Sequence, residues 1–445
     1  MRVAVIGTGY VGLISGVCLA DKGHKVICVD RDLTIVQRLN AGIPTIHEKG
    51  LPAMLSRVVL DNMFSATNSI DAALSDAEIV LVAVGTPSVN GSIDLSAIAN
   101  VCDSIGEFIK NSSRYICVVI KSTVIPSTTD TFIRDQLEKS SEKKLGQFGL
   151  GMNPEFLREG KAIEDFNSPD RIVFGYEDLE TLTRLELLYQ PWDADKLAMS
   201  TRSAELVKYA NNMLLATQIS AINEIANLSA MLGGIDFEDI IKGIHLDKRW
   251  SPILDSGDRV KPQILSYLEP GCGFGGSCFP KDVEAFRSQG ESLGLKMQLS
   301  NAVLNINYDQ PFQVATILQK TLGSIEGKEI LVLGLAFKPD TDDVRESPAL
   351  KIITDLINRG VHVTAHDPIA ISNFKTCLNN SEAVIFIDDW RQELDRFDTI
   401  VVITSWAEYI EIGNYQLESK TIFDARGMYG KGELDCANYL TFGSS

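Results

Sequence analysis

The sequence predicts an α/β protein with two doubly wound domains, one at each end of the chain, joined by a long central helix and a helical middle domain. Three observations predict this class. A strand, a Gly-rich turn, a helix and a second strand open the chain. Short apolar runs then alternate with helical patterns, which is typical of a parallel sheet covered on both faces. Finally, residues 203–232 contain neither Pro nor Gly.

The first domain is expected to span residues 1–200. Apolar residues predict a strand at 3–6, a helix at 13–19 and a second strand at 26–29, which together form one βαβ unit. The same alternation continues along the domain, with strands expected at 79–84, 115–120 and 172–174 and helices at 95–108 and 129–137. We therefore expect a parallel sheet here.

The helical middle domain is expected over residues 201–312, beginning with the helix at 203–232. A helix of about 30 residues is roughly 45 Å long, so we expect it to link two domains and to pair with a copy of itself. The third domain, 313–445, repeats the order strand, helix, strand, with elements expected at 329–333, 347–359, 361–365, 384–387, 399–403 and 421–423.

The overall charge restricts the partners of the protein. The formal net charge is −18 and the pI is near 4.8, so nucleic acid and anionic membrane surfaces would be repelled. The N-terminus lacks the charged and apolar regions of a signal peptide, and a cytoplasmic protein is expected. The eight cysteines have no Cys-x-x-Cys or His-rich spacing, so neither a disulfide framework nor a metal site is expected.

Gly7, Gly9 and Gly12 form a Gly-x-Gly-x-x-Gly pattern directly after the first strand and at the start of the first helix. Such glycines allow a tight turn and bring a pyrophosphate close to the helix N-terminus. Asp30 closes the second strand, where a carboxylate accepts hydrogen bonds from the adenosine ribose. The pattern predicts a Rossmann-like dinucleotide site. Asp30 favours NAD over NADP, although Arg31 beside it leaves NADP open.

Two later loops follow strands at the carboxyl edge of the expected sheet, where ligands of doubly wound folds bind. They contain Thr86 and Thr123, and an ordinary strand exit explains each loop equally well. The third domain is also Rossmann-like but lacks the three-glycine pattern, so no second dinucleotide is expected there. Its Lys338 and Arg345 either meet phosphates or form a surface charge cluster. We interpret Asp367, at the end of a strand, as a structural turn residue.

Residues 270–282 place Cys278 on a glycine-dense turn beside Lys281 and Asp282. A thiol acts as a nucleophile only as the thiolate, and a nearby ammonium group favours that charged form. Together with the dinucleotide pattern, this segment predicts a nicotinamide enzyme that holds its substrate covalently on sulfur.

Five motifs together resemble the UDP-glucose/GDP-mannose dehydrogenase family over nearly the whole chain. They are Gly-x-Gly-Tyr-Val-Gly at 7–12, Asn-Pro-Glu-Phe-Leu-Arg-Glu-Gly at 153–160, Ala-Glu-Leu-Val-Lys-Tyr-Ala-Asn-Asn at 204–212, Gly-Gly-Ser-Cys-Phe-Pro-Lys-Asp at 275–282, and the segment 338–347. The resemblance implies NAD in the first domain, the nucleotide of a UDP-sugar in the third, the reaction between them, and a homodimer built on the central helix. The implied reaction oxidises the sugar C6 hydroxymethyl group twice, to a carboxylate, with two NAD. The cysteine motif is more similar to the UDP-glucose branch than to the GDP-mannose or N-acetylhexosamine branches.

The resemblance also implies roles for individual residues, and no metal. The catalytic set would be Cys278 as nucleophile, Lys208 and Asn212 at the oxygen on C6, Asp282 and Thr123 at the hydrolytic water, and Glu159 in proton transfer or hydrolysis. Cofactor contacts would come from Gly7, Gly9, Tyr10, Val11, Gly12, Asp30, Thr86, Thr123, Glu159, Lys281 and Arg345. Substrate contacts would come from Glu155, Phe156, Leu157, Glu159, Lys208, Asn212, Arg259, Gly275, Lys338 and Arg426.

Three features depart from the family pattern. Pro126 follows Thr123 one residue later than usual, which changes the backbone expected there, and Ile35 replaces a basic residue on the adenosine side. The segment between 243 and 270 is longer than usual, so Arg249 and Arg259 compete for the role of substrate-binding arginine. We favour Arg259 from the sequence that follows it.

Three alternatives remain open from the sequence. The enzyme oxidises another nucleotide sugar, such as a UDP-N-acetylhexosamine or GDP-mannose. Or it is a two-electron dehydrogenase of the hydroxyacid type, which has no use for Cys278. Or the chain is a catalytically silent NAD-binding regulator, with Cys278 as a redox-sensing thiol and Cys272 as its resolving partner.

Overall fold

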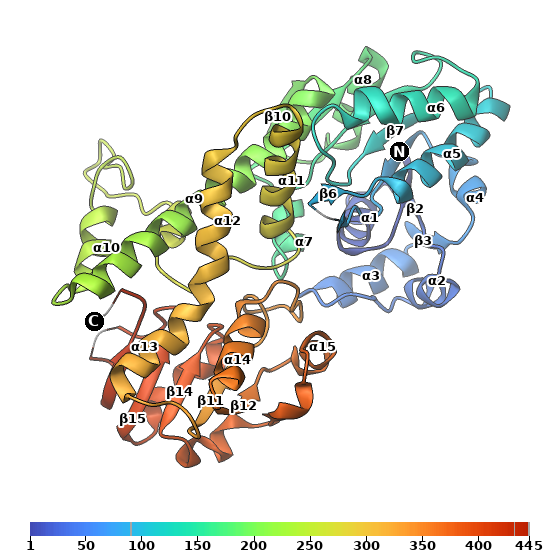
Figure 1. Cartoon of the computed structure of the whole chain (residues 1–445). Coiled ribbons are helices and arrows are strands. Elements are labelled where there is room, and N and C mark those ends of the chain that lie inside the picture. The colour runs from blue at the N-terminus through green and yellow to red at the C-terminus, as the bar shows by residue number, and fades with distance from the viewer. Residues whose placement is uncertain (90, 431, 444–445) are drawn as a thin grey trace. The chain divides into compact units, whose positions relative to one another are not determined.

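The computed structural model describes residues 1–89, 91–430 and 432–443. The chain divides into two compact units, Met1–Asn211 and Asn212–Ser445. The division falls within α9 (Thr201–Leu232), a helix of 32 residues that contributes to both units (Figure 1). At a rise of about 1.5 Å per residue this helix is roughly 48 Å long, and it confirms the long helix that the sequence predicts.

An eight-stranded sheet forms the centre of the first unit. Its strands follow the order β10-β9-β8-β7-β4-β1-β2-β3. Their bounds are β1 (Arg2–Ile6), β2 (Lys25–Val29), β3 (Phe64–Thr67), β4 (Ile79–Val82), β7 (Cys117–Ile120), β8 (Gly149–Met152), β9 (Arg171–Tyr176) and β10 (Asp195–Met199). Neighbouring strands run parallel except β8 and β9, where Gly151 pairs with Tyr176 in antiparallel register. The sheet is therefore mixed, which corrects the expectation of a purely parallel sheet.

Alternate residues of β1 point to opposite faces of this sheet. Val3 and Val5 belong to one buried apolar core, and Ala4 and Ile6 belong to another. From Val3 to Ile6 the strand is thus buried on both faces, which explains why these four residues are all apolar.

Helices and a small hairpin complete the first unit. They are α1 (Tyr10–Asp21), α2 (Leu33–Asn40), α3 (Leu51–Leu60), α4 (Ile70–Leu74), the hairpin of β5 (Ser88–Val89) and β6 (Ser92–Ile93), α5 (Ser96–Asn111), α6 (Arg134–Ser141), α7 (Ala162–Asn167) and α8 (Leu179–Leu188). The helix expected at 129–137 is in fact a π-helical turn, Thr128–Ile133, followed by α6.

The second unit contains a six-stranded sheet with the order β13-β12-β11-β14-β15-β16, in which all pairs are parallel. The strands are β11 (Glu329–Leu333), β12 (His362–His366), β13 (Val384–Phe386), β14 (Thr399–Val402), β15 (Leu417–Asp424) and β16 (Cys436–Leu440). The helices are α10 (Phe237–His245), α11 (Phe279–Ser292), α12 (Gln298–Asp309), α13 (Gln313–Leu322), α14 (Pro348–Asn358) and α15 (Ile371–Cys377).

Candidate active site

The turn between β1 and α1 needs its glycines for different reasons. Gly7 has a φ of +99°, and a Cβ there would lie 2.7 Å from the carbonyl oxygen of Ala83. A Cβ on Gly12 would lie 2.0 Å from the carbonyl oxygen of Gly7. At Gly9 a Cβ would meet no described atom within 4 Å, so this position leaves open space at the N-terminus of α1, where a pyrophosphate binds.

Asp30 lies directly after β2, as the sequence predicts. Its carboxylate accepts a hydrogen bond from the Thr8 hydroxyl and one from the Asp32 amide, the latter at 3.0 Å. A carboxylate has about four acceptor sites in total, so this group suits the ribose hydroxyls of a dinucleotide. The turn and Asp30 together fit NAD.

Tyr10, the first residue of α1, is held by a glutamate that sequence reasoning missed. The Tyr10 hydroxyl donates to the carboxylate of Glu48, which is 4% exposed. Burial, the hydrogen bond to Glu48 and the charge of Glu48 raise the pKa of Tyr10. Glu48 also accepts hydrogen bonds from the amides of Gly160 (2.8 Å) and Ala162 (2.9 Å). Glu159, half-buried, directly precedes Gly160.

A buried ion pair lies elsewhere in the first unit. Lys208 Nζ is 2.9 Å from Glu155 Oε1, and the two side chains are 5% and 6% exposed. Burial alone would raise the pKa of Glu155, but the charge and hydrogen bond of Lys208 and the hydrogen bond from the Leu157 amide lower it overall. Glu155 is therefore ionised and acts as the counter-ion of Lys208. Beside them, the ring of Phe156 lies 5.9 Å from Lys208 Nζ.

A second buried cation, Lys121, stands near this pair. Lys121 is 3% exposed and donates to Asn153 Oδ1 at 2.9 Å. Burial lowers the pKa of Lys121 to about 8, while the nearby charge of Glu155 acts in the opposite direction. The sequence contained a signal for this residue, because a lysine directly follows the four buried apolar residues of β7.

The loop after β7 is tied to α9 at its far end. Glu205 of α9 accepts hydrogen bonds from the amides of Ser127 (2.7 Å) and Thr129 (2.8 Å). Burial raises the pKa of Glu205 to about 7. At the start of the loop after β7, the Thr123 carbonyl accepts a hydrogen bond at 2.8 Å from the hydroxyl of Thr86, which lies in the loop after β4. The structure thus brings these two predicted residues together.

In the second unit, Cys278 occupies the N-cap position of α11. The positive end of a helix favours a negative charge, so this position suits a thiolate. Asp282 lies one turn further on, is 1% exposed, and donates its amide to the Cys278 carbonyl at 2.8 Å. Its carboxylate accepts hydrogen bonds from Asn212 Nδ2 and Lys281 Nζ, both at 2.7 Å. The structure thus brings Asn212, Lys281 and Asp282 together.

The glycines before Cys278 pack against the loop that follows β11. A Cβ on Gly275 would lie 2.3 Å from the carbonyl oxygen of Glu346. Gly276 has a φ of +78°, and a Cβ there would lie 2.7 Å from the Phe337 ring, while its amide donates to the Arg345 carbonyl at 2.9 Å. Both glycines are therefore required by packing within this unit.

The predicted basic residues of the second unit lie in different settings. Lys338 Nζ is 5.1 Å from the ring of Phe337. Arg345 is 62% exposed and pairs with Asp343 at 2.8 Å. Arg426 donates from Nε to the Ile403 carbonyl at 2.8 Å, and lines a cavity of about 660 Å³ beside α10 and β16.

The two competing arginines are both engaged by their own segment. Arg249 is 87% exposed and pairs with Asp247 at 2.6 Å. Arg259 donates from Nη1 to the carbonyls of Leu246 and Ser251, at 2.9 Å each. The guanidinium of Arg259 is thereby fixed in orientation, whereas that of Arg249 projects into solvent.

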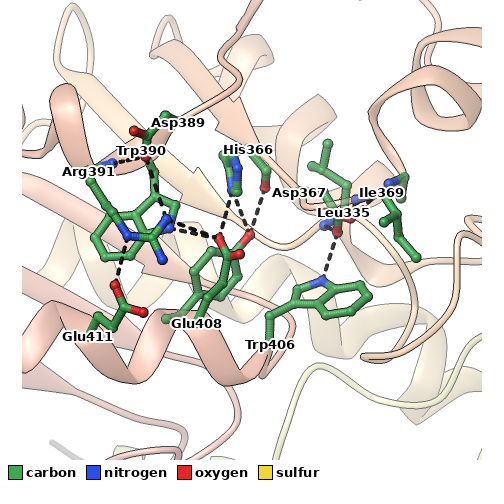
Figure 2. Close-up of polar contacts among 12 residues, drawn as sticks. Leu335, His366, Asp367, Ile369, Asp389, Trp390, Arg391, Trp406, Glu408 and Glu411 are labelled. Carbon is green, nitrogen blue, oxygen red and sulfur yellow. Dashed lines mark hydrogen bonds and ion pairs between the residues drawn. The ribbon is translucent and has the colours of Figure 1, made fainter.

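Asp367 has a structural role, as the sequence indicated. Its carboxylate accepts hydrogen bonds from the Leu335 amide and the Trp406 indole, at 2.7 and 3.0 Å (Figure 2). Three more backbone amides donate to it, those of Ala336, Ile369 and Ala370. In a second dinucleotide site, this carboxylate would have to accept hydrogen bonds from a ribose, but five protein donors already occupy it. Asp367 therefore holds the loops at the carboxyl ends of β11 and β14 in place.

The fold and the site define an NAD-dependent dehydrogenase with a cysteine on a glycine-rich loop. Three family models match the chain: the NAD-binding domain of the UDP-glucose/GDP-mannose dehydrogenase family at residues 1–193, its central domain at 202–309 and its UDP-binding domain at 331–431. The chain belongs to this family. It is therefore an oxidoreductase that uses NAD and acts on a nucleotide sugar.

Individual relatives match the chain over at least 92% of their own length. The UDP-glucose 6-dehydrogenase TuaD of Bacillus subtilis is 38% identical, and the match covers 99% of this chain and 92% of TuaD. The UDP-glucose 6-dehydrogenase AglM of Haloferax volcanii is 35% identical, with 97% and 98% covered. The solved structure of a UDP-glucose dehydrogenase from Pyrobaculum islandicum matches with a TM-score of 0.89 at 37% identity, over 100% of this chain and 98% of that one.

Across the residues that the structure describes, no helix has both the length and the apolar character required to cross a membrane.

Proposed function

We propose that this protein oxidises UDP-glucose to UDP-glucuronate, using two NAD and a covalent intermediate on Cys278. The observation that carries the proposal is Cys278 at the N-cap of α11, with the oriented carboxylate of Asp282 one turn away. The relatives named above are UDP-glucose dehydrogenases, and each match covers at least 97% of this chain. They support the same substrate.

The proposed chemistry proceeds in two oxidations and one hydrolysis. The C6 alcohol first loses a proton and a hydride to become an aldehyde; NAD, when bound, accepts the hydride of each oxidation. The thiolate of Cys278 then adds to the aldehyde carbon, and the carbonyl oxygen takes up a proton to give a thiohemiacetal. Loss of the second hydride and of that proton leaves a thioester. Water attacks the thioester, the C–S bond breaks, and the carboxylate, the thiolate and the two protons of the water are released.

Charged and polar residues of each unit have roles in this scheme. Lys208 stabilises the negative charge that develops on the oxygen at C6, an effect that is strong in a site without water. The ionised Glu155 at 2.9 Å keeps Lys208 protonated for this role. Thr123 and Asp282 hold the hydrolytic water, Asn212 orients Asp282, and Glu159 assists proton transfer.

The remaining predicted residues bind the two ligands. The turn at Gly9 and the carboxylate of Asp30 hold the dinucleotide, with Thr86, Lys281 and Arg345 as further cofactor contacts. The segment 155–159, Gly275, Lys338 and Arg426 contact the UDP-sugar. Among the two candidate arginines we propose Arg259, because its guanidinium is oriented by two carbonyls and still has further N–H donors to offer.

We further propose a cytoplasmic homodimer in which copies pair along α9. Leu214, Ile225, Leu228 and Leu232 are all at least 46% exposed and recur at helical spacing on α9. An apolar stripe of this kind is typical of a helix interface. Light scattering should give the dimer mass for the wild type and for a Leu60→Asp control, whose leucine is exposed on α3, and the monomer mass for Leu228→Asp. A monomeric wild type would contradict the proposal.

Counting the NADH formed per nucleotide sugar consumed tests the reaction. With limiting UDP-glucose and excess NAD, we expect a ratio of two. A ratio of one would favour a two-electron dehydrogenase, and turnover of a UDP-N-acetylhexosamine or GDP-mannose in place of UDP-glucose would change the substrate.

The redox-sensor alternative is disfavoured by the setting of Cys272. This thiol is completely buried in the apolar core of the second unit, and burial raises its pKa to about 12. A resolving thiol must reach a partner sulfur as a thiolate, and this environment opposes both requirements.

A further inference from the structure

Glu48 lies in the loop before α3 and belongs to none of the motifs discussed above. It is nevertheless 4% exposed, and an ionised carboxylate is costly to bury unless its oxygens accept hydrogen bonds. One oxygen accepts from the Tyr10 hydroxyl and from the Gly160 amide at 2.8 Å, and the other accepts from the Ala162 amide at 2.9 Å. Three donors thus compensate its burial.

These donors come from two segments with different tasks. Tyr10 begins α1, whose N-terminus takes the pyrophosphate of the dinucleotide. Gly160 and Ala162 follow the segment 155–159, which contacts the nucleotide sugar in the proposed function. The Tyr10 hydroxyl also accepts a hydrogen bond from the Gly160 amide at 3.1 Å, so the phenol, the carboxylate and the amide form a closed triangle.

The turn at Gly160 has an independent anchor on its other side. The Arg158 amide donates to Asp165 at 2.8 Å, and the Arg158 guanidinium pairs with the same carboxylate at 2.6 Å. Gly160 itself has a φ of +79°, a conformation that favours glycine. The position of Glu159 is therefore set by Arg158–Asp165 on one side and by Glu48 on the other, and Glu48 is also bonded to Tyr10 of the cofactor-binding helix.

We propose that Glu48 is a positioning residue that couples dinucleotide binding to nucleotide-sugar binding, through Tyr10 on one side and Gly160 on the other. The inference rests on the proposed function. A dinucleotide that orders the start of α1 also orders Tyr10. Because Tyr10 is bonded to Glu48, and Glu48 to Gly160, the dinucleotide then also orders the turn that carries Glu159. Because coupling between two binding sites is reciprocal, the nucleotide sugar strengthens dinucleotide binding by the same factor.

The test measures the affinity of the protein for NADH with and without saturating UDP-glucose. NADH and UDP-glucose do not react with each other, so both stay bound unchanged. Wild-type protein is compared with Glu48→Gln and Tyr10→Phe. An amide at position 48 turns one of the two acceptors into a donor, which faces the amide of Gly160 in one orientation and that of Ala162 in the other. The phenylalanine removes the link to α1 but leaves the carboxylate and its two backbone donors in place. Glu164→Gln, an exposed glutamate on α7, is the matched control.

We expect UDP-glucose to lower the NADH Kd of the wild type and of Glu164→Gln by roughly fivefold or more, a typical coupling factor. In Glu48→Gln and Tyr10→Phe the ratio should fall to about one, although each ligand alone still binds. A purely structural role would weaken both ligands and leave the ratio intact, which would overturn the inference.

The two hypotheses fail in different ways. If both ligands bind the wild type without coupling, only the role of Glu48 is overturned. If UDP-glucose does not bind at all, the proposed function is overturned together with it. Should Glu48→Gln not fold, Tyr10→Phe decides alone, because a wild-type coupling ratio in that variant contradicts the link through the phenol.

Discussion

Breaking the buried pair of Lys208 and Glu155 should have a large and unequal effect on stability. At 2.9 Å, two unit charges attract by about 6 kcal/mol at an effective dielectric constant of about 20. Removing one partner of a buried pair costs about 3 to 5 kcal/mol, because the other charge is left uncompensated. Glu155→Gln should cost more than Lys208→Met, since it leaves two buried cations, Lys208 and Lys121, without the carboxylate that both interact with.

Calorimetry measures this effect on the thermal transition of the first unit, which is identified as the one that NADH shifts upward. For a unit of this size, a loss of 3 to 5 kcal/mol lowers the Tm by roughly 6 to 20 °C. Lys144→Met is the control, because Lys144 pairs with Glu138 at 2.6 Å but is 81% exposed, and such pairs contribute about 1 kcal/mol or less. The double variant Lys208→Met/Glu155→Gln should recover much of the loss. Single variants that unfold within about 1 kcal/mol of the wild type would refute this reasoning.

Three further outcomes are expected. Gly9→Ala should fold normally but bind NADH more weakly. Gly12→Ala should fail to form a stable first unit, because its Cβ would lie 2.0 Å from a carbonyl oxygen; equal Tm values for the two variants would contradict this. The pKa of Glu205 is raised from 4.5 to about 7, so the folded state binds more protons than the unfolded state between these pH values. Its stability should therefore fall as pH rises through this range, by up to about 3 kcal/mol relative to Glu205→Gln. Urea unfolding at several pH values checks this, and the same pH dependence of the unfolding free energy in both proteins would rule it out. Asp367→Ala should lower the unfolding free energy of the second unit by at least about 3 kcal/mol, since it leaves five donors, four of them on buried residues, without an acceptor, and urea unfolding checks it.

Local sequence predicted the elements that are buried on both faces. After their exposed first residues, Arg2 and Glu329, β1 and β11 are uninterrupted apolar runs with a positive-φ glycine directly after them, so pattern and structure agree. β8 contains two glycines and β10 is largely exposed and contains Asp195 and Lys196. Neither has a strand pattern, because tertiary pairing rather than local preference places them in the sheet.

The candidate site was predictable only in part, for a similar reason. Gly7, Asp30 and Cys278 belong to patterns whose spacing has a physical meaning in one short segment. Glu48 does not, because its partners Tyr10 and Gly160 are 38 and 112 residues away. A carboxylate that becomes important through contacts so distant in the chain leaves no local signal.

The covalent role of Cys278 is the central claim, and UDP-glucuronate formation by Cys278→Ala tests it most directly. The control is Cys436→Ala, which removes another half-buried thiol of the same unit. With excess NAD and UDP-glucose, we expect the control to form UDP-glucuronate at the wild-type rate. Cys278→Ala should still bind NADH, while its carboxylate formation falls by several orders of magnitude. Undiminished UDP-glucuronate production by Cys278→Ala would contradict the covalent mechanism.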